Sequence, residues 1–420
     1  MGIELRLRGS SGEFVLANGS RLPSGHFRIE QTNSGRPFLY FERTQPLAFC
    51  AALGGLLDAV FQGRTTAGQI IRTCGPNEYV GGPKEFCLTL LSVEVGQVGT
   101  DGHTHSLSLT NLRFPSDKPD STTFMVSWGS MEIPLRLNPR RNYLERIRQL
   151  AKTEDVMPTA TLRFRAPNLA GNAVGDFITD LCLALSIVQG KKVNWVYHAT
   201  YGPRRTFQHA VFGGTVCKAD TAQPLCFNPT MRTGVTLALT ASKDALPRIK
   251  QFRETYDPNN RVINAWLDAR TETDYLEGRT LKYVVVIEAL NALTASVANI
   301  SRRIHEKALW RQLHKKITDA LPGEPLIPNL ESWQRLNERF FRDLLSEVCQ
   351  HHKLTVQPSD LTLFKRIRDN IVHRFGYDPA IMLPSEWNMP NKHQVSQHFF
   401  AAWFVDRIIL QLFGLSAPQP

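Results

Sequence analysis

The segment LTLFKRIRDNIVHRFGYDP, residues 361–379, contains side chains suited to binding an anion and moving a proton. Arg368 supplies a guanidinium that binds anions, Asp369 a carboxylate, and His373 an imidazole, the group that exchanges protons near neutral pH. On an ideal helix these residues spread over about 140° of one side, and His373 lies about 7.5 Å further along the axis than Arg368. A ligand that approaches from that side is within reach of all three.

The helix that positions these residues has one apolar stripe. At about 100° per residue, Phe364, Ile367, Ile371 and Phe375 fall close together. Arg368 falls inside the same stripe, where an unpaired buried charge costs several kcal/mol. We therefore expect Arg368 to meet a carboxylate, a cleft or a second subunit.

A purely structural interpretation of the same turn stays open. Gly376 has the place of a helix C′ residue, and Pro379 soon follows it. His373 and Arg374 are then last-turn cations that complement the helix dipole. This interpretation explains the sign of the two charges but does not explain the position of Arg368.

A second helical segment, residues 275–296, carries the opposite anomaly. Its apolar stripe runs through Leu281, Val284, Val285 and Ala292. Glu288 falls in the middle of that stripe, so the simplest arrangement is a buried pair between Glu288 and Arg368. Such a pair orients a functional arginine or is purely structural, because a buried ion pair is a weak stabilising device.

The residues RDNIVH, 368–373, match the motif of HEPN domains: Arg, then Asn, Asp or His, three further residues, and His. The match lies near the end of a late helix in a C-terminal helical region, where that family has it. The helix with LEGRTLKYVVVIEAL resembles the family's early bundle helix, including the acidic position at Glu288. The layout of the whole chain is similar to the ApeA-like anti-phage abortive-infection family.

This resemblance implies a metal-independent endoribonuclease that needs no cofactor and works as a homodimer with one composite cleft. The resemblance implies that the ribose 2′-OH attacks the adjacent phosphorus, and that cleavage leaves 2′,3′-cyclic phosphate and 5′-OH ends. DNA is then expected to be inert, because it lacks the 2′-OH. His373 suits proton transfer, Arg368 suits stabilisation of the developing phosphorane, and Asp369 orients either of them.

Further residues around the motif have expected roles in contacting RNA. Asn370 and Tyr377 are expected to contact it directly. Three cations, Lys365, Arg366 and Arg374, are expected to guide it by its phosphates. An ordinary solvated face is the alternative for each of these cations.

The chain is basic, with a formal net charge of +11 over 420 residues. Residues 271–420 hold 18 basic and 16 acidic side chains, so residues 1–270 carry an excess of +9. This balance fits a nucleic-acid partner, possible tRNA included, bound partly by the N-terminal region, and it equally fits a solvated basic surface. The N-terminal region is also the place expected to sense a phage-derived trigger.

The fold class expected from the pattern is α+β, with the boundary after residue 241. Residues 1–241 are expected to form a β-rich sensor, RNA-binding or regulatory region, and residues 242–420 an all-α, HEPN-type nuclease bundle. The expected strands are 3–8, 26–30, 38–43, 86–95, 106–114, 122–128, 132–137, 159–165, 193–200 and 204–212. The expected helices are 47–61, 142–152, 174–188, 244–255, 263–269, 274–298, 302–320, 330–350, 361–375 and 394–412.

The cysteines and hydropathy predict a cytoplasmic protein without a membrane partner. Seven cysteines, no CxxC and no export signal indicate reduced thiols. No apolar run reaches about 18 residues, the length of a membrane span. The pairs Cys217/Cys226 and His103/His105 remain open as metal ligands, although neither spacing matches a common zinc motif.

Three classes of function remain in competition. The first is a homodimeric ribonuclease of a bacterial defence or toxin system, held inactive until infection is sensed. The second is a non-catalytic HEPN module for dimerisation or nucleotide binding that partners a separate nucleotidyltransferase. The third is a metal-dependent nuclease or hydrolase, for which the sequence shows no convincing ligand cluster and no P-loop.

Overall fold

The structure is a computed structural model of the chain. It describes residues 6–16, 18–31, 37–42, 59–74, 78–81, 85–96, 104–112, 114, 121–140, 142–143, 145, 158–166, 169, 172–202, 206–213, 234–271, 275–301, 303, 306–320, 340–387, 389 and 392–416. Two compact units are present, Met1–Pro247 and Arg248–Pro420. Their boundary lies inside helix α4 (Gly234–Thr255), which contains Pro247, and close to the predicted boundary after residue 241.

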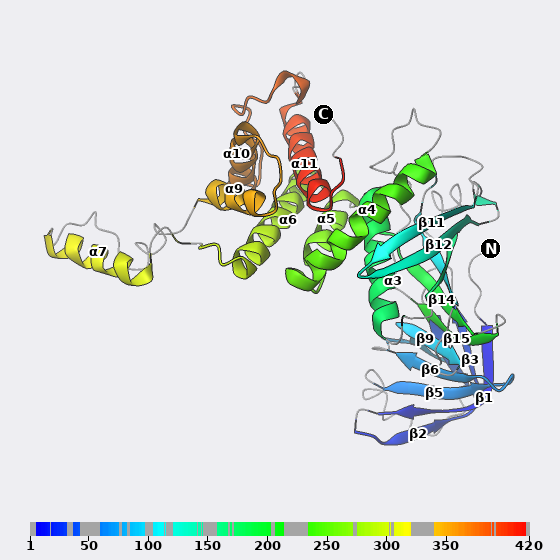
Figure 1. The fold of residues 1–420 in the computed structure, drawn as a ribbon. Coiled ribbons are helices and arrows are strands. Elements are labelled where there is room, and N and C mark those ends of the chain that lie inside the picture. The colour runs from blue at the N-terminus through cyan, green and yellow to red at the C-terminus, as the bar shows by residue number, and fades with distance from the viewer. Residues whose placement is uncertain are drawn as a thin grey trace. The chain divides into compact units, whose positions relative to one another are not determined.

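The first unit is built on a 15-stranded sheet in which all pairings are antiparallel (Figure 1). The strands are β1 (Arg6–Val15), β2 (Arg21–Ser24), β3 (Phe27–Gln31), β4 (Pro37–Glu42), β5 (Val60–Thr65), β6 (Ile70–Cys74), β7 (Glu78–Gly81), β8 (Glu85–Thr89), β9 (Ser92–Gly96), β10 (Thr104–Thr110), β11 (Thr122–Trp128), β12 (Met131–Pro139), β13 (Pro158–Arg165), β14 (Trp195–Tyr201) and β15 (Phe207–Gly213). Their order is β11-β12-β13-β10-β14-β15-β9-β6-β5-β1-β3-β4-β8-β7, and β2 pairs with β1 off this path.

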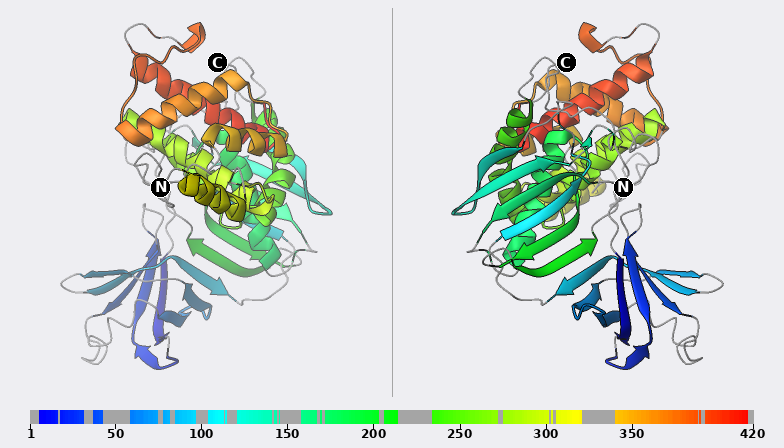
Figure 2. Two further views of the ribbon diagram at one scale, coloured as in Figure 1. Left: turned by 90° about the vertical axis from the view of Figure 1, so that its left-hand side faces the viewer. Right: turned by 90° about the vertical axis from the view of Figure 1, so that its right-hand side faces the viewer.

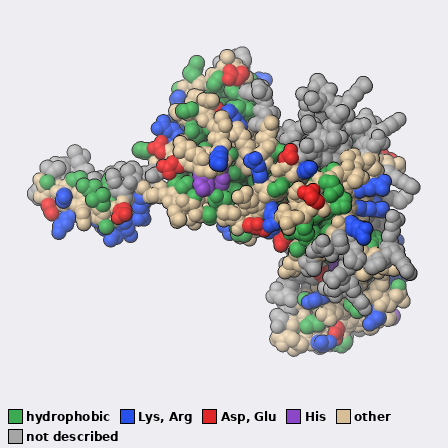
Figure 3. All heavy atoms as spheres, in the orientation of Figure 1, with side chains coloured by type: hydrophobic (Ala, Val, Ile, Leu, Met, Phe, Trp, Pro, Cys, Tyr) green, Lys and Arg blue, Asp and Glu red, His purple; other side chains and the backbone are tan. Residues whose placement is uncertain are grey.

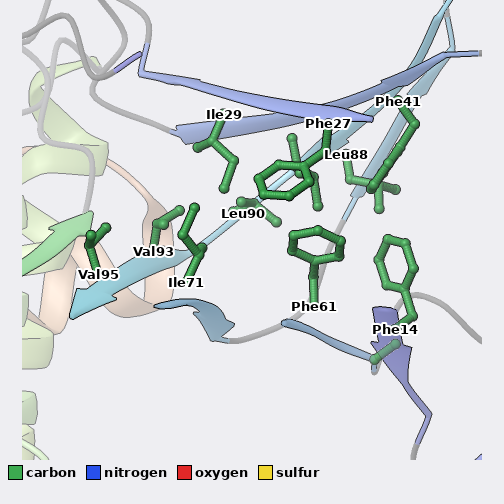
Figure 4. Close-up of a cluster of buried hydrophobic side chains, with 12 residues drawn as sticks. Phe14, Phe27, Ile29, Phe41, Phe61, Ile71, Leu88, Leu90, Val93 and Val95 are labelled. Atoms are coloured by element: carbon green, nitrogen blue, oxygen red, sulfur yellow. The ribbon is translucent and has the colours of Figure 1, made fainter. Parts of the chain in front are cut away.

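Period-two alternation explains why these segments form strands, because successive side chains point to opposite faces. Alternate residues of β3 and β4 face an aromatic core that Figure 4 shows. At its centre the Phe61 ring lies 5.1 Å from Phe14, 4.9 Å from Phe27 and 5.7 Å from Phe41, measured between centroids. This core holds together the strands from the first part of the chain.

Helix α3 (Asn172–Gln189) covers the strands from the later part of the unit. Phe177 packs edge-on against Phe164 of β13 and Trp128 of β11, with ring centroids 5.1 and 5.6 Å away. Trp128 Nε1 donates a 2.9 Å hydrogen bond to Oδ2 of the buried Asp180. The contacts make α3 a core helix of the sheet.

Several sequence expectations for this unit are corrected by the structure. Strands β2, β5, β6 and β7 are present where none was expected. The single strand expected over 86–95 is two strands: β8 pairs with β4 and β7, and β9 pairs with β15 and β6. The helix expected over 47–61 lies outside the described residues up to 58, and Val60 and Phe61 belong to β5. Most of the helix expected over 142–152 also lies outside the described residues.

The second unit is helical, as predicted (Figures 1 and 2). After the end of α4 it contains α5 (Arg261–Thr271), α6 (Leu276–Val297), α7 (Lys307–Ala320), α9 (Phe341–His351), α10 (Pro358–Arg374), the short η3 (Ser385–Trp387) and α11 (His393–Leu412). Helix α6 is central, because it contacts α5, α9, α10 and α11. The α+β class is therefore confirmed at this level.

Two expected helices differ from the structure in ways that matter for the bundle. Helix α7 starts at Lys307 rather than 302 and has no buried side chain, so it adds nothing to a bundle core. The helix expected over 330–350 starts at Phe341, because Phe340 has an extended backbone; residues 330–339 lie outside the described part.

A buried polar group fastens α5 to α11. Asp406 of α11 accepts a 2.7 Å hydrogen bond from Trp266 Nε1 and pairs with Arg270, both on α5. Burial raises the pKa of Asp406, although Arg270 beside it acts in the opposite direction. The interaction fixes the register of these two helices from the side away from the α10 motif.

Two helices, α3 and α6, are long and apolar enough to cross a membrane by length and composition alone. The apolar stretch of α3 is two-thirds buried within the fold and that of α6 is half-buried. Helix α3 packs against β11 and β13, and α6 packs against α5. Their apolar composition is therefore explained by their place in the cores of the two units.

Candidate functional site

Helix α10 is positioned by an apolar stripe that matches the sequence expectation over most of its length. Leu361, Phe364, Ile367 and Ile371 are buried. The Phe364 ring stacks on Phe404 of α11, with centroids 4.5 Å apart. This packing fixes the rotation of α10 and so decides where the motif side chains point.

The end of α10 differs from the expectation. Phe375, not Gly376, takes the left-handed conformation that caps the helix, with φ 47° and ψ 45°. The ring of Phe375 is 62% exposed and therefore lies outside the core stripe in which it was expected. An aromatic residue in this backbone region is strained, since Cβ crowds the carbonyl oxygen.

Helix α6 buries a different face from the one expected. Its buried side chains include Tyr283, Ile287, Leu290 and Thr294, while Val285 is 48% exposed. Of the expected stripe, Val284 is buried, Leu281 and Ala292 are half-buried, and Val285 is exposed, so the expectation is wrong at Val285. Glu288 lies at the margin of the buried face, where its carboxylate can reach a neighbouring helix.

Glu288 and Arg368 meet in the structure. Arg368 donates from Nη2 and Nε to Glu288 Oε1 at 2.6 and 3.1 Å. The side chain of Glu288 is 42% exposed and that of Arg368 is 21% exposed. The pair is therefore partly solvated, whereas a buried pair was expected. The reason is the rotation of α6, which leaves Glu288 at the edge of the interface with α10.

The remaining sides of the Arg368 guanidinium are also occupied. Nη1 donates to Asp369 Oδ1 at 3.1 Å, and the guanidinium carbon lies 5.1 Å from the centre of the Phe341 ring of α9. Asp369 in turn accepts a 2.5 Å hydrogen bond from Lys365 Nζ, one turn earlier. Two cations and two carboxylates thus form one network with Glu288.

The electrostatics of this network keep Arg368 and Asp369 charged. Partial burial acts to lower the pKa of Arg368, but the hydrogen bonds that it donates to Glu288 and Asp369 outweigh burial, and the pKa is raised. Partial burial acts to raise the pKa of Asp369, but Lys365 and Arg368 outweigh it and lower the pKa. Arg368 is consequently a fixed, permanently charged donor at neutral pH.

His373 lies one and a half turns beyond Arg368 and is exposed. Among the described residues, no hydrogen bond or ion pair occupies its ring. An exposed imidazole at a helix end can exchange protons with solvent or with a ligand. The structure therefore separates a fixed cation from an accessible acid–base group on one helix.

Tyr377 has an internal partner. The Tyr377 hydroxyl lies 2.7 Å from Thr280 Oγ1 on α6. Thr280 Oγ1 also lies 2.8 Å from Nδ1 of the buried His398 on α11. Burial raises the pKa of Tyr377 to about 12 and lowers the pKa of His398 to about 4. This chain of groups ties the loop after α10 to two other helices and so gives Tyr377 a positioning role, while its contact with RNA stays a prediction.

The other expected RNA contacts lie on the outside of α10. Asn370 donates from Nδ2 to the carbonyl of Arg366 at 3.1 Å. Arg366 and Arg374 are exposed, and Lys365 is held by Asp369. Of the residues singled out from the sequence, the structure joins Arg368, Asp369, Glu288 and Lys365 and leaves the rest around them.

The metal ligands considered from the sequence are only partly described. Cys217, Cys226 and His103 lie outside the described residues, while His105 is buried and its Nδ1 lies 3.1 Å from His198 Nε2. Within the part of the chain that the structure describes, no group of three or more His, Cys, Asp or Glu side chains could hold a metal ion. Cys349 is a buried thiol whose pKa burial raises to about 12.

Sequence reasoning missed Phe341, Thr280 and His398. Phe341 faces Arg368 from a different helix, and Thr280 and His398 lie 97 and 21 positions from Tyr377 along the chain. Contacts at these separations leave no local period or spacing in the sequence. The sequence signal that could have found Thr280 and His398 is that each is a polar side chain in a largely apolar helix.

Comparisons with known proteins give no further guide. No protein-family model, no curated protein and no solved structure matches the chain. The chemistry of the site is therefore inferred from its residues and their geometry.

Proposed function

We propose that the chain is a metal-independent endoribonuclease of the HEPN type, acting as a homodimer in a bacterial anti-phage, abortive-infection system in the cytoplasm. The observation that carries the proposal is Arg368. Its guanidinium is aimed by Glu288, Asp369 and Phe341, and His373 is accessible on the same helix.

The arrangement of Arg368 supports catalysis more than stability. Partly exposed ion pairs contribute roughly 0–1 kcal/mol, so a three-sided clamp is more than helix packing needs. The three hydrogen bonds use one N–H on each guanidinium nitrogen, so one N–H on Nη1 and one on Nη2 are left to donate to a phosphate oxygen. The role assigned to it is to stabilise charge on the phosphorane.

His373 takes the proton-transfer role. Attack of the ribose 2′-OH on the adjacent phosphorus needs a group that accepts the hydroxyl proton and one that donates a proton to the leaving 5′-oxygen. The new bond joins O2′ to phosphorus, the P–O5′ bond breaks, and a 2′,3′-cyclic phosphate and a 5′-OH result. One His373 imidazole that accepts the hydroxyl proton can pass it to the leaving oxygen, so one imidazole in the cleft is enough.

The helix geometry favours a second copy. Arg368 and His373 point about 140° apart and are separated by about 7.5 Å along the axis, so one copy offers both to a ligand from one side and a second copy can close the other side. Val372 lies between them on the outer face and is 40% exposed, and the half-exposed Val285 is one turn before Glu288. Apolar side chains flanking a charged cluster suit a self-association surface.

The test of the proposed function is the nature of the substrate and of the product ends. Purified full-length protein is incubated in EDTA with an RNA and with the same sequence carrying 2′-O-methyl groups, with and without extract from phage-infected cells. We expect only the RNA to be cut, with 2′,3′-cyclic phosphate ends. Cleavage of the 2′-O-methyl strand, or loss of cleavage in EDTA, would contradict the proposal, and uncut RNA under every condition would favour the non-catalytic module.

A further inference from the structure

The turn at the end of α10 presents an aromatic ring beside the proposed proton-transfer group. Phe375 comes two positions after His373 and is 62% exposed. Figures 1 and 2 show the loop that begins here at one end of the helical unit. We propose that the Phe375 ring stacks on an unpaired base of the RNA, so that the substrate is a single-stranded segment. This contact rests on the proposed function and adds to it the class of RNA that the site accepts.

The position of the ring is not the one that local packing favours. Phe375 follows the buried Ile371 by four positions, and Ile371 continues the buried stripe of Phe364 and Ile367. One more helical residue would place Phe375 on that stripe, where its ring would leave water. At Phe375 the chain instead takes φ 47° and ψ 45° and leaves the helix. The fold therefore gives up the burial of a large aromatic side chain.

The backbone at Phe375 has a second cost that a glycine would avoid. Its left-handed conformation crowds Cβ against the carbonyl oxygen, and the next residue, Gly376, does not take that conformation in its place. Strained residues of this kind concentrate where a side chain contacts a ligand. Exposure and strain thus agree in holding the ring outward.

Two hydrogen bonds fix the turn in this form. The Tyr377 hydroxyl lies 2.7 Å from Thr280 Oγ1 on α6. Gln397 of α11 donates from Nε2 to the carbonyl oxygen of Asp378 at 2.8 Å. The backbone that carries Phe375 is therefore anchored to two helices before any ligand arrives. A ring on an anchored backbone loses less conformational freedom on binding than a ring on a flexible loop.

The surroundings of the ring favour a nucleic-acid strand as its partner. Arg374, directly before Phe375, is exposed, and so is Arg366, about two turns earlier on α10. Cations beside an exposed ring suit a strand in which phosphates alternate with bases. Figure 3 shows Lys and Arg side chains scattered over many elements, so charge alone does not single out this turn. The distinguishing feature is the outward ring next to those cations and to His373.

Single-stranded RNA follows from the geometry of stacking. A base within a duplex is stacked on its neighbours, whereas an unpaired base can be splayed out onto an aromatic side chain. Two residues span at most about 7 Å of chain. The base that Phe375 covers therefore belongs to a nucleotide close to the phosphate that His373 serves.

The test measures binding separately from cleavage. A fluorescent 2′-O-methyl strand of about ten nucleotides, which lacks the attacking hydroxyl, is titrated with the full chain as a single strand and as a duplex. We expect wild type to prefer the single strand and Phe375→Leu to weaken single-strand binding at least fivefold, since one stacked base contributes roughly that much or more. Phe375→Trp, which keeps an aromatic plane, should bind as wild type does.

The matched control is Phe207→Leu, because Phe207 of β15 is also a phenylalanine that is 42% exposed. This control should leave binding of both strands unchanged. Sedimentation of each variant accompanies the titrations. Unchanged single-strand binding by Phe375→Leu together with a smaller sedimentation coefficient would assign the ring to a contact between copies and overturn the stacking role.

A second measurement needs no variant. A single strand that carries 5-iodouridine is photo-cross-linked to wild type, and the tryptic peptide 375–392 should carry the label at its first residue, Phe375. Labels confined to other residues, equal effects of Phe375→Leu and Phe207→Leu, duplex binding at least as tight as single-strand binding, or no binding by wild type would overturn the contact. Binding with the expected Phe375 dependence but without cleavage of unmodified RNA would contradict the ribonuclease alone.

Discussion

Arg368 is held by more partners than a surface cation needs, and Glu288 is the partner that comes from a different helix, α6. Its carboxylate accepts two hydrogen bonds from the guanidinium and so sets the direction of the planar donor. Because both side chains are partly solvated, removing the negative charge of Glu288 should affect the orientation of the Arg368 guanidinium more than the stability of the fold.

We therefore expect Glu288→Gln to lower RNA cleavage at least tenfold while the free energy of unfolding changes by less than about 1 kcal/mol. Urea unfolding and initial cleavage rates measure the two quantities. Glu306→Gln, an exposed change before α7, is the control for both. Loss of stability in proportion to loss of activity would make the ion pair structural.

His398 makes the helical unit sensitive to acid. Burial lowers its pKa to about 4 in the folded chain, below the value of about 6.5 in an unfolded chain. The unfolded state therefore takes up the proton first, and stability that is complete above about pH 6.5 is lost as the pH falls toward 4.

This linkage predicts that His398 removes about 2 kcal/mol of stability between pH 7.5 and pH 5. Urea unfolding of wild type and His398→Gln at the two pH values measures it. The variant should lose that much less on acidification, since its amide keeps a polar group near Thr280 without titrating. An identical loss in both proteins would show that other groups, such as His352, account for the acid sensitivity.

At the scale of elements, the sequence predicts α10 well because its local pattern and its tertiary packing agree. Three of the four predicted stripe positions, Phe364, Ile367 and Ile371, are buried while Phe375 is exposed, and the expected contact between Glu288 and Arg368 is present. Which face of α6 is buried was not predictable, because α6 is apolar nearly all round and its neighbours decide its rotation.

Strand prediction fails where tertiary pairing overrides local texture. Short polar segments such as β2 and β7 become strands because a neighbouring strand offers its backbone donors and acceptors. The residue chain Tyr377–Thr280–His398 also depends on contacts distant in sequence.

The strained end of α10 gives an element-scale prediction. Phe375 adopts a left-handed conformation with its ring exposed, so Phe375→Gly removes steric strain and little packing. Relief of strain stabilises the variant, and the greater flexibility of glycine in the unfolded chain offsets part of the gain. We expect a net increase of up to about 1 kcal/mol in the free energy of unfolding, measured by urea unfolding. A clear destabilisation would mean that the Phe375 ring has a packing partner in solution, such as a second copy.

At the scale of the whole molecule, the account requires two copies to share one cleft. Arg368→Ala and His373→Ala should each be inactive alone, whereas a mixture forms heterodimers that join the histidine of one copy to the arginine of the other. Equimolar mixing is expected to restore a measurable fraction of cleavage, checked against sedimentation of each variant. Activity that stays absent in a mixture of folded dimers would place both groups in one copy.

The central claim is that Arg368 and His373 carry out metal-independent RNA cleavage. The most direct measurement compares wild type, Arg368→Ala and His373→Ala on total cellular RNA in EDTA, with infected-cell extract supplied and the fragment ends analysed. Arg261→Ala and His393→Ala, exposed changes at the starts of α5 and α11, are the matched controls. Cleavage by wild type and controls only, leaving 2′,3′-cyclic phosphate, is the predicted result; equal cleavage by all five proteins would contradict the account.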